Sequence, residues 1–205
     1  MTIRFHKNDL PDLSNYDVDA VAIDTETLGL KPHRDRLCVV QLSPGDGTAD
    51  VVQIDAGQKK APSLVALLKN RKITKLFHYA RFDLAVLYHS FGVMPEPVFC
   101  SKIASRLTRT YTDRHGLKDL CNELLGVSLS KAQQSSDWAA ETLSPEQLEY
   151  AASDVLYLHQ LREKLIVRLE REKRTREADA CFRFLPTRAK LDLMGWEEAD
   201  IFAHS

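Results

Sequence analysis

Residues 18–30 read VDAVAIDTETLGL, and this stretch decides the fold. Five of its first six residues, all but Asp19, are apolar, and three of them are β-branched, which is typical of a buried strand. Asp24 and Glu26 follow, and alternate residues of an extended chain point to the same side. Because carboxylates are costly to bury unless they are paired or bind metal, the two acids indicate a site for Mg²⁺ or Mn²⁺. A polar turn capped by Asp24 is the alternative, and this stretch alone does not separate the two.

The segments that follow predict more of a sheet. Two apolar runs, residues 37–42 and 51–54, flank the turn signal PGDG at residues 44–47, so a β-meander is expected. A helix over residues 62–69, a strand over 73–77 and a helix over 80–91 come next.

The second half is predominantly helical. Residues 117–125 form a predicted helix that Gly126 ends, and SPEQ at residues 144–147 is a capping box with proline at the first helical position. An apolar stripe at helical spacing predicts one long helix that continues into the charged stretch 168–177, read as a solvated face. The stripe consists of Leu148, Ala151, Val155, Leu158, Leu161 and Leu165. The order of elements predicts an α/β fold, a mixed sheet flanked by helices.

Composition restricts the class of protein. The 205 residues are 44 % hydrophobic and 28 % charged, and no run approaches the roughly 20 apolar residues of a membrane span. The formal net charge of −1 argues against a long duplex as ligand, because such proteins usually have a basic surplus. The four scattered cysteines form no CxxC pair, and residues 1–10 show no secretory signal. We therefore expect a cytoplasmic protein without a membrane partner.

Three later residues extend the acidic pair. Asp83 lies in the first turn of the predicted helix 80–91, and Tyr150 and Asp154 share one face of the later helix. Taken singly, each has a structural interpretation: an acid favoured at a helix N-terminus, a half-buried tyrosine and a surface acid. Together with Asp24 and Glu26, they form a pattern that favours a shared site.

The pattern resembles the DEDD exonucleases in their tyrosine form. It consists of DxE after a strand, FD at a helix start and YxxxD on a late helix. GLKDL at residues 116–120, LGVSLSK at 125–131, SDW at 136–138 and LSPEQLEYAASDVLYL at 143–158 resemble ribonuclease D. The resemblance covers residues 18–165 and implies a ribonuclease H-like (DnaQ-like exonuclease) fold. Tyr79 departs from the pattern, because relatives often have Asn there, and ribonuclease D has Arg-Pro in place of Glu141-Thr142.

This resemblance implies a 3′–5′ exoribonuclease that hydrolyses RNA to nucleoside 5′-monophosphates with two divalent cations, Mg²⁺ or Mn²⁺. Asp24 would bridge both ions, Glu26 and Asp154 would hold the ion beside the attacking water, and Asp83 would support the second ion. Tyr150 would orient the water, since a tyrosine with an ordinary pKa of about 10 is a poor base at pH 7.

Within the family, the chain resembles the short single-domain bacterial nanoRNase C group. That likeness implies very short RNA substrates such as dinucleotides, and a homo-oligomer. We expect an exonuclease domain over residues 1–181 and no HRDC domain of the kind that follows the catalytic domain in ribonuclease D. Residues 182–205 would form a C-terminal tail, packed on this domain or on a neighbouring subunit.

The same resemblance suggests substrate contacts from Thr27, Leu28, Leu30, His78 and Lys131. Leu30 matches a hydrophobic wedge against terminal bases, with a packed core leucine as the alternative. His78 is equally consistent with a core histidine, and Lys131 with a solvated surface residue. Three arginines, Arg106, Arg109 and Arg114, form either a phosphate-binding patch or, as we expect, solvated loop charges.

Two other functions remain open at this stage. The same chemistry could act on DNA oligonucleotides or on single-stranded RNA in general, because discrimination depends on contacts to the 2′-hydroxyl. A catalytically silent nucleic-acid-binding module on the same fold is a rival from another class. The presence of all four carboxylates and Tyr150 speaks against it.

Overall fold

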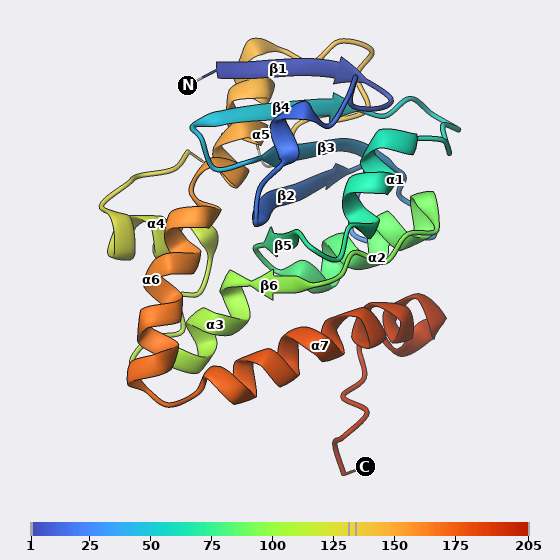
Figure 1. The fold of residues 1–205 in the computed structure, drawn as a ribbon. Helices are drawn as coiled ribbons and strands as arrows, with labels where there is room; N and C mark the ends of the chain where they lie inside the picture. Colours follow the sequence, from blue (N-terminus) through green and yellow to red (C-terminus); the bar gives the residue numbers. More distant parts are fainter. Residues whose placement is uncertain (1, 131, 134, 205) are drawn as a thin grey trace.

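A mixed sheet lies at the centre of the computed structural model, which describes residues 2–130, 132, 133 and 135–204 (Figure 1). Its strands are β1 (Thr2–Lys7), β2 (Ala20–Thr27), β3 (Leu37–Ser43), β4 (Thr48–Gln53), β5 (Thr74–Phe77) and β6 (Val98–Cys100). Their order is β1-β4-β3-β2-β5-β6. The antiparallel pairs β2–β3 and β3–β4 confirm the predicted meander, whereas β1, β5 and β6 join in parallel.

β2 occupies the middle of the sheet, between β3 and β5. This position explains its apolar start, because residues 20–23 are covered on both faces and at most 4 % exposed. The strand extends past residue 23 and includes both Asp24 and Glu26. Its pairing with β3 becomes irregular only between Glu26 and Thr27. The two acids therefore lie on a fixed strand rather than in a loop.

Helices cover both faces of the sheet. Within the described residues they are α1 (Pro62–Lys69), α2 (Ala80–Phe91), α3 (Ser101–Thr108), α4 (Leu117–Leu125), α5 (Pro145–Leu156), α6 (Leu158–Arg171) and α7 (Thr175–Leu191). α5 packs against β2, β3 and β4, and α2 against β2, β3 and β5. Thr25 points to α2, so its neighbours Asp24 and Glu26 point to the face that α5 covers. None of these helices has the length and apolar content that a membrane span requires.

The predicted capping box is confirmed, but the single long helix is wrong. Gln147 N donates to Ser144 Oγ at 3.2 Å, and Ser144 N donates to Gln147 Oε1 at 2.9 Å. The helix then breaks at Tyr157 (φ −102°, ψ −5°) and again before α7. The apolar stripe continues through the first break, although the packing partners change there. α5 packs on the sheet, whereas α6 packs mainly on α3 and α4. Packing partners, rather than the period of the stripe, thus decide where the helix ends.

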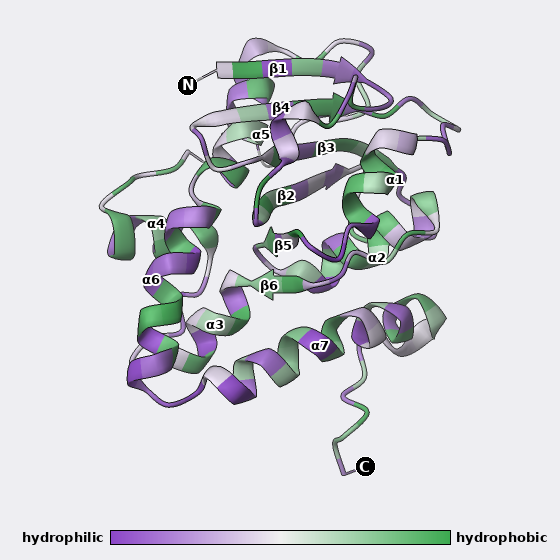
Figure 2. Cartoon of the chain, in the orientation of Figure 1, coloured by the Kyte–Doolittle hydropathy of each residue, from purple (hydrophilic) through white to green (hydrophobic). Residues whose placement is uncertain are grey.

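The edge strands β1 and β6 and helix α3 have no counterpart in the predicted elements. Figure 2 shows hydrophobic and hydrophilic residues alternating along α7, which packs its apolar side on α2 and β6. The predicted boundary between residues 181 and 182 falls inside this helix, and Phe182 packs against Phe99 with ring centroids 4.9 Å apart.

Candidate active site

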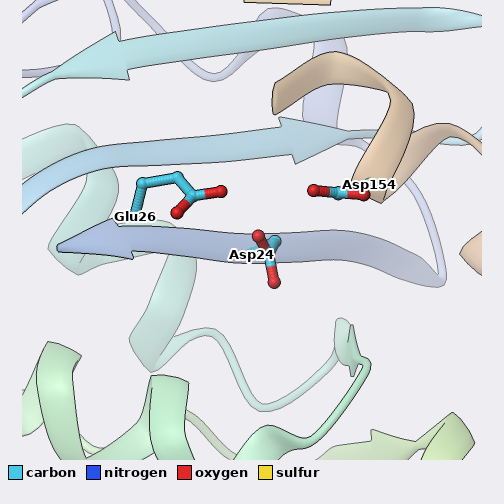
Figure 3. Close-up of side chains that lie close together, drawn as sticks. All are labelled: Asp24, Glu26 and Asp154. Carbon is cyan, nitrogen blue, oxygen red and sulfur yellow. The ribbon is translucent and has the colours of Figure 1, made fainter. Parts of the chain in front are cut away.

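Three of the predicted acids converge on one face of the sheet. Asp24 and Glu26 project from β2, and Asp154 approaches from α5 (Figure 3). One carboxylate oxygen from each lies within 4.8 Å of the other two. The convergence follows from the strand alternation that puts Asp24 and Glu26 on one side and from the packing of α5 on that side. Three carboxylates at this spacing could hold a metal ion.

Asp24 has a neutral partner on the neighbouring strand. Gln41 lies opposite it in the β2–β3 register and donates from Nε2 to Asp24 Oδ2 at 3.0 Å. The side chain of Gln41 is fully buried, and its Oε1 has no hydrogen-bond partner among the described residues. An amide fixed in this way determines the orientation of the Asp24 carboxylate without neutralising its charge.

Asp83 lies near the three acids but is not brought into their group. Its carboxylate is 2 % exposed and accepts a hydrogen bond from Thr25 Oγ1 at 2.7 Å. Thr25 faces the α2 side of β2, so this bond holds Asp83 behind the strand. The negative charge of Asp83 nevertheless contributes to raising the pKa of both Asp24 and Glu26.

The four carboxylates lack positive partners. Burial, followed by repulsion from the neighbouring acids, raises the pKa of Asp24 well above its usual range and that of Glu26 to about 8. Burial raises the pKa of Asp154 and of Asp83 to about 7, although hydrogen bonds from Tyr150 and Thr25 oppose these rises. No Lys, Arg or His in the described parts of the chain forms an ion pair with any of them. Hard oxygen donors with excess negative charge fit Mg²⁺ or Mn²⁺.

Tyr150 lies one helical turn before Asp154 on the same face of α5. Its ring packs beside Trp138, with the centroids 6.0 Å apart and the planes at 41°. Burial first, and then the nearby carboxylates, raise the pKa of Tyr150 above its ordinary value. Its hydroxyl therefore stays protonated at neutral pH. It can donate a hydrogen bond and orient a water molecule, but it is a poor base.

The acids open onto a cleft of about 740 Å³. Four of the predicted substrate contacts line this cleft: Thr27, Leu28, Leu30 and His78. Lys131, the fifth, lies outside the described residues. Leu30 is 83 % exposed, so the alternative of a packed core leucine is wrong. Its side chain lies at the mouth of the cleft because residues 28–36 form a loop beyond the end of β2.

His78 combines both interpretations that the sequence left open. Its Nδ1 lies 2.9 Å from Ser101 Oγ, so the ring is held from within the protein, yet it also lines the cleft. Burial, and then the positive charge of Lys102, lower the pKa of His78 to about 3. The ring is therefore neutral, and it offers the cleft a polar edge without charge.

Arg109 does not belong to a solvated patch of loop charges. It is 1 % exposed, its Nη2 pairs with Glu123, and its Nη1 donates to the backbone oxygen of Arg114 at 2.6 Å. The expectation of solvated charge is wrong for this residue because its partners lie in the following loop and in α4. Arg109 thus fixes the loop that leads to Gly116 at the edge of the cleft.

Sequence reasoning missed several residues of the cleft. Lys102, Lys118 and Tyr79 line it, and Gln41 lies behind it. Tyr79 adopts a left-handed conformation (φ 67°, ψ 42°) at the start of α2. Asn tolerates this conformation far better than Tyr, which explains the Asn that relatives often have here. The departure of Tyr79 from the family pattern is the sequence feature that could have identified it as a residue of the cleft.

Known exonucleases resemble this chain over most of its length. A family model described as 3′–5′ exonuclease matches residues 7–170. Ribonuclease D of Acidiphilium cryptum is 40 % identical over 157 residues, which are 75 % of this chain and 39 % of the relative. Ribonuclease D of Bartonella henselae is 35 % identical over 161 residues, 78 % of this chain and 39 % of the relative. The chain thus spans about two fifths of the length of these relatives.

Solved structures resemble the whole chain. NrnC of Brucella melitensis is 78 % identical, with a TM-score of 0.98 and both chains covered in full. The same protein with bound Mg²⁺ (76 % identical, TM-score 0.97) and bound to pGG (77 % identical, TM-score 0.98) also matches over the full length of both chains. These matches confirm the predicted ribonuclease H-like fold.

Proposed function

Because this chain belongs to the 3′–5′ exonuclease family, with ribonuclease D among its relatives, we propose that it hydrolyses RNA from the 3′ end to nucleoside 5′-monophosphates. The observation that supports this most strongly is the group Asp24, Glu26 and Asp154. Three carboxylate oxygens lie within 4.8 Å of one another in an open cleft, and no Lys, Arg or His of the described residues forms an ion pair with them.

The proposed substrate is very short RNA, such as a dinucleotide. Its support is the full-length similarity to Brucella melitensis NrnC, which has been solved bound to pGG. The net charge of −1 agrees with a substrate that has few phosphates. Lys102 and Lys118 both line the cleft and could contact those phosphates.

The proposed cofactors are two divalent cations, Mg²⁺ or Mn²⁺. Asp24 would bridge them, and Glu26 and Asp154 would complete the site of one. Asp83, which is bonded to Thr25 on the other side of β2, would support the second through its negative charge. When present, the cations supply the Lewis acidity that activates water at neutral pH and offsets charge on the phosphate. The Mg²⁺ found in Brucella NrnC agrees with this assignment.

The protein's own side chains would orient the reactants. Tyr150, protonated and beside Asp154, donates a hydrogen bond to the attacking water and fixes its direction. Gln41 keeps Asp24 in one orientation. Leu28 and Leu30, 53 % and 83 % exposed, offer apolar surface to the terminal bases. Apolar contact with leucine reads no hydrogen-bonding group of a base, so little base preference is expected.

We also propose that the chain assembles with copies of itself in the cytoplasm. Large apolar side chains near the C-terminus remain exposed, among them Met194 (67 %), Trp196 (44 %) and Phe202 (79 %). Exposed apolar surface of this kind favours a protein–protein contact. Full activity from a protein that sediments as a monomer would remove this support. The cysteines are free thiols, which suits a reducing compartment.

A time course with 5′-labelled RNAs of two and seven nucleotides, and with matched DNA oligomers, tests the function. The full chain is incubated with Mg²⁺ or Mn²⁺ beside an Asp24→Asn control for contaminating nuclease. We expect metal-dependent cleavage of the RNA dinucleotide well ahead of the longer strand. Similar rates on both lengths would indicate a general trimming exonuclease, and faster cleavage of DNA would reassign the substrate. No metal-dependent cleavage by the wild type would overturn the enzyme and favour a silent binding module.

A further inference from the structure

The segment that follows α7 is tied to the start of α2, at one rim of the cleft. Asp192 accepts two hydrogen bonds from Arg81, from Nε to Oδ2 at 2.5 Å and from Nη2 to Oδ1 at 2.8 Å. Arg188 pairs with the same carboxylate at 2.8 Å, so Asp192 lies between two guanidinium groups. Arg81 also donates to the backbone oxygen of Glu197. The Asp192 side chain is only 12 % exposed. Two parallel hydrogen bonds to one guanidinium fix the relative orientation of the two side chains, in addition to pairing their charges.

Arg81 lies where α2 begins, two residues after Tyr79 and two before Asp83. Tyr79 has the left-handed backbone that a tyrosine adopts only under constraint. Its ring lines the cleft, with Lys102 Nζ 4.4 Å from the ring centroid. The Arg81–Asp192 pair holds this first turn from outside α2, together with the hydrogen bond from Thr25 to Asp83. Loss of the pair would let Tyr79 relax away from its place in the cleft.

The same segment is tied to a second part of the cleft lining, the loop 28–36. His33 Nε2 donates to the backbone oxygen of Leu193 at 2.7 Å. His33 belongs to the loop 28–36, which presents Leu28 and Leu30 to the cleft. Inside the loop, Asp35 accepts a hydrogen bond from Lys31 N at 3.0 Å, which ties the two sides of His33 together. Consecutive residues, Asp192 and Leu193, therefore hold both parts of the cleft lining.

On this geometry, we propose that Asp192 is a positioning residue for the substrate, an inference that rests on the proposed function. It acts through Arg81 on Tyr79 and, through the adjacent Leu193, on the loop of Leu28 and Leu30. The acids Asp24, Glu26 and Asp154 stand on β2 and α5, which have no substantial contact with this segment in the described structure. Asp192 therefore sets how well short RNA is held, while the three acids on β2 and α5 are independent of it.

The test compares Asp192→Asn with Glu198→Gln, a matched loss of one exposed tail carboxylate. With the RNA dinucleotide, we expect Asp192→Asn to raise KM about tenfold, with kcat and Mn²⁺ affinity within about twofold of the wild type. Glu198→Gln should leave all three unchanged. Asp192→Glu, which keeps the charge, should recover part of the loss. Arg81→Lys removes the paired hydrogen bonds to Asp192 by changing the donor instead of the acceptor. It replaces Asp192→Asn in the test if that variant does not fold.

Two outcomes would overturn the inference. One is an unchanged KM in both Asp192→Asn and Arg81→Lys. The other is an equal loss of kcat and Mn²⁺ affinity, which would mean a general structural role. Calorimetric titration with pGG in Ca²⁺ measures binding without turnover, so the expected tenfold weaker binding of the variants can be checked even if the wild type shows no hydrolysis. Absence of hydrolysis by the wild type would contradict the proposed function alone.

Discussion

Two acids on the same sheet, Asp50 buried and Asp24 partly buried, have opposite surroundings. Asp50 on β4 is 2 % exposed and accepts hydrogen bonds from Arg4 (2.8 and 2.7 Å), His6 (2.7 Å) and Tyr16 (2.6 Å). Burial would raise the pKa of Asp50, but these bonds outweigh it, and the pKa is lowered. Asp24 on β2 has other acids as neighbours, and its pKa is raised.

The difference separates a structural acid from a functional one. A buried carboxylate is costly without compensation, and at Asp50 the protein provides all of it. At Asp24 the described residues provide a neutral amide from Gln41 and a backbone hydrogen bond at Thr25, but no ion pair with a cation. The missing positive charge must come from outside, which is what a metal site requires. Incomplete compensation, rather than burial itself, identifies the site.

The largest expected effect comes from exchanging each acid for its amide. Asp24→Asn should reduce RNA hydrolysis by about 10³-fold or more without lowering the melting temperature, because it removes metal-binding charge and relieves repulsion. Asp50→Asn should leave kcat within about twofold but lower the melting temperature by roughly 10 °C, since it leaves buried partners unpaired. Rate measurements and thermal unfolding on both variants check this. The distinction would collapse if Asp50→Asn cost as much activity as Asp24→Asn.

The pH dependence of stability should sharpen the contrast. A carboxylate whose pKa is higher in the folded protein stabilises it below the unfolded pKa and loses that contribution as the pH rises through the folded pKa. For Glu26 and Asp154 this window ends at about 8 and about 7. Without metal, the melting temperature of Asp24→Asn should exceed that of the wild type by roughly 5 °C more at about pH 8.5 than at about pH 5.

Mn²⁺ should remove most of this difference, because the cation compensates the carboxylates of the wild type. Thermal unfolding at both pH values, with a chelator or with Mn²⁺, measures it. A gap between the two proteins that does not change with pH would argue against repulsion among the acids.

A smaller effect is expected from the amide that orients Asp24. Gln41→Ala should weaken Mn²⁺ binding about tenfold, the usual cost of losing a hydrogen bond to a metal ligand. Gln53→Ala is the matched control: Gln53 is also buried, but it donates to the backbone oxygen of Ala140 at 2.7 Å, away from the acids. Calorimetric Mn²⁺ titrations of both variants are the measurement. Equal losses would show that any buried glutamine matters and that orientation of Asp24 does not.

The smallest effect concerns the exposed leucine of the cleft. Leu30→Ala should raise KM for the RNA dinucleotide about fivefold and leave the melting temperature unchanged, because an exposed side chain contributes little to folding. Leu165→Ala, at a fully buried position, should do the reverse and cost roughly 2–5 kcal/mol of stability. Steady-state kinetics and thermal unfolding separate the two. A lower melting temperature for Leu30→Ala would place that side chain in the core.

Local signals in the sequence predict much of this fold. The apolar start of β2 and the alternation of Asp24 and Glu26 are readable because a central strand is covered on both faces. The helix start at Ser144 is readable because its capping hydrogen bonds are local. The break at Tyr157 is not, since the apolar stripe continues through it while the packing partners change.

The site is predictable only where its residue types stand out. Gln41 is hidden inside an apolar run, and nothing local shows that it lies opposite Asp24. Asp83 is predicted as a site residue, but its bond to Thr25 depends on which side of β2 faces α2. The contact between Arg81 and Asp192 joins residues 111 positions apart, so no local pattern predicts it.

The most direct test of the central claim is a Mn²⁺ titration, followed by electron paramagnetic resonance, of the wild type, Asp24→Asn and Asp50→Asn. The uncompensated acids should bind the ion and the compensated acid should not. We therefore expect equal Mn²⁺ binding by the wild type and Asp50→Asn, and loss of binding in Asp24→Asn. Unchanged binding in a folded Asp24→Asn protein would contradict the account.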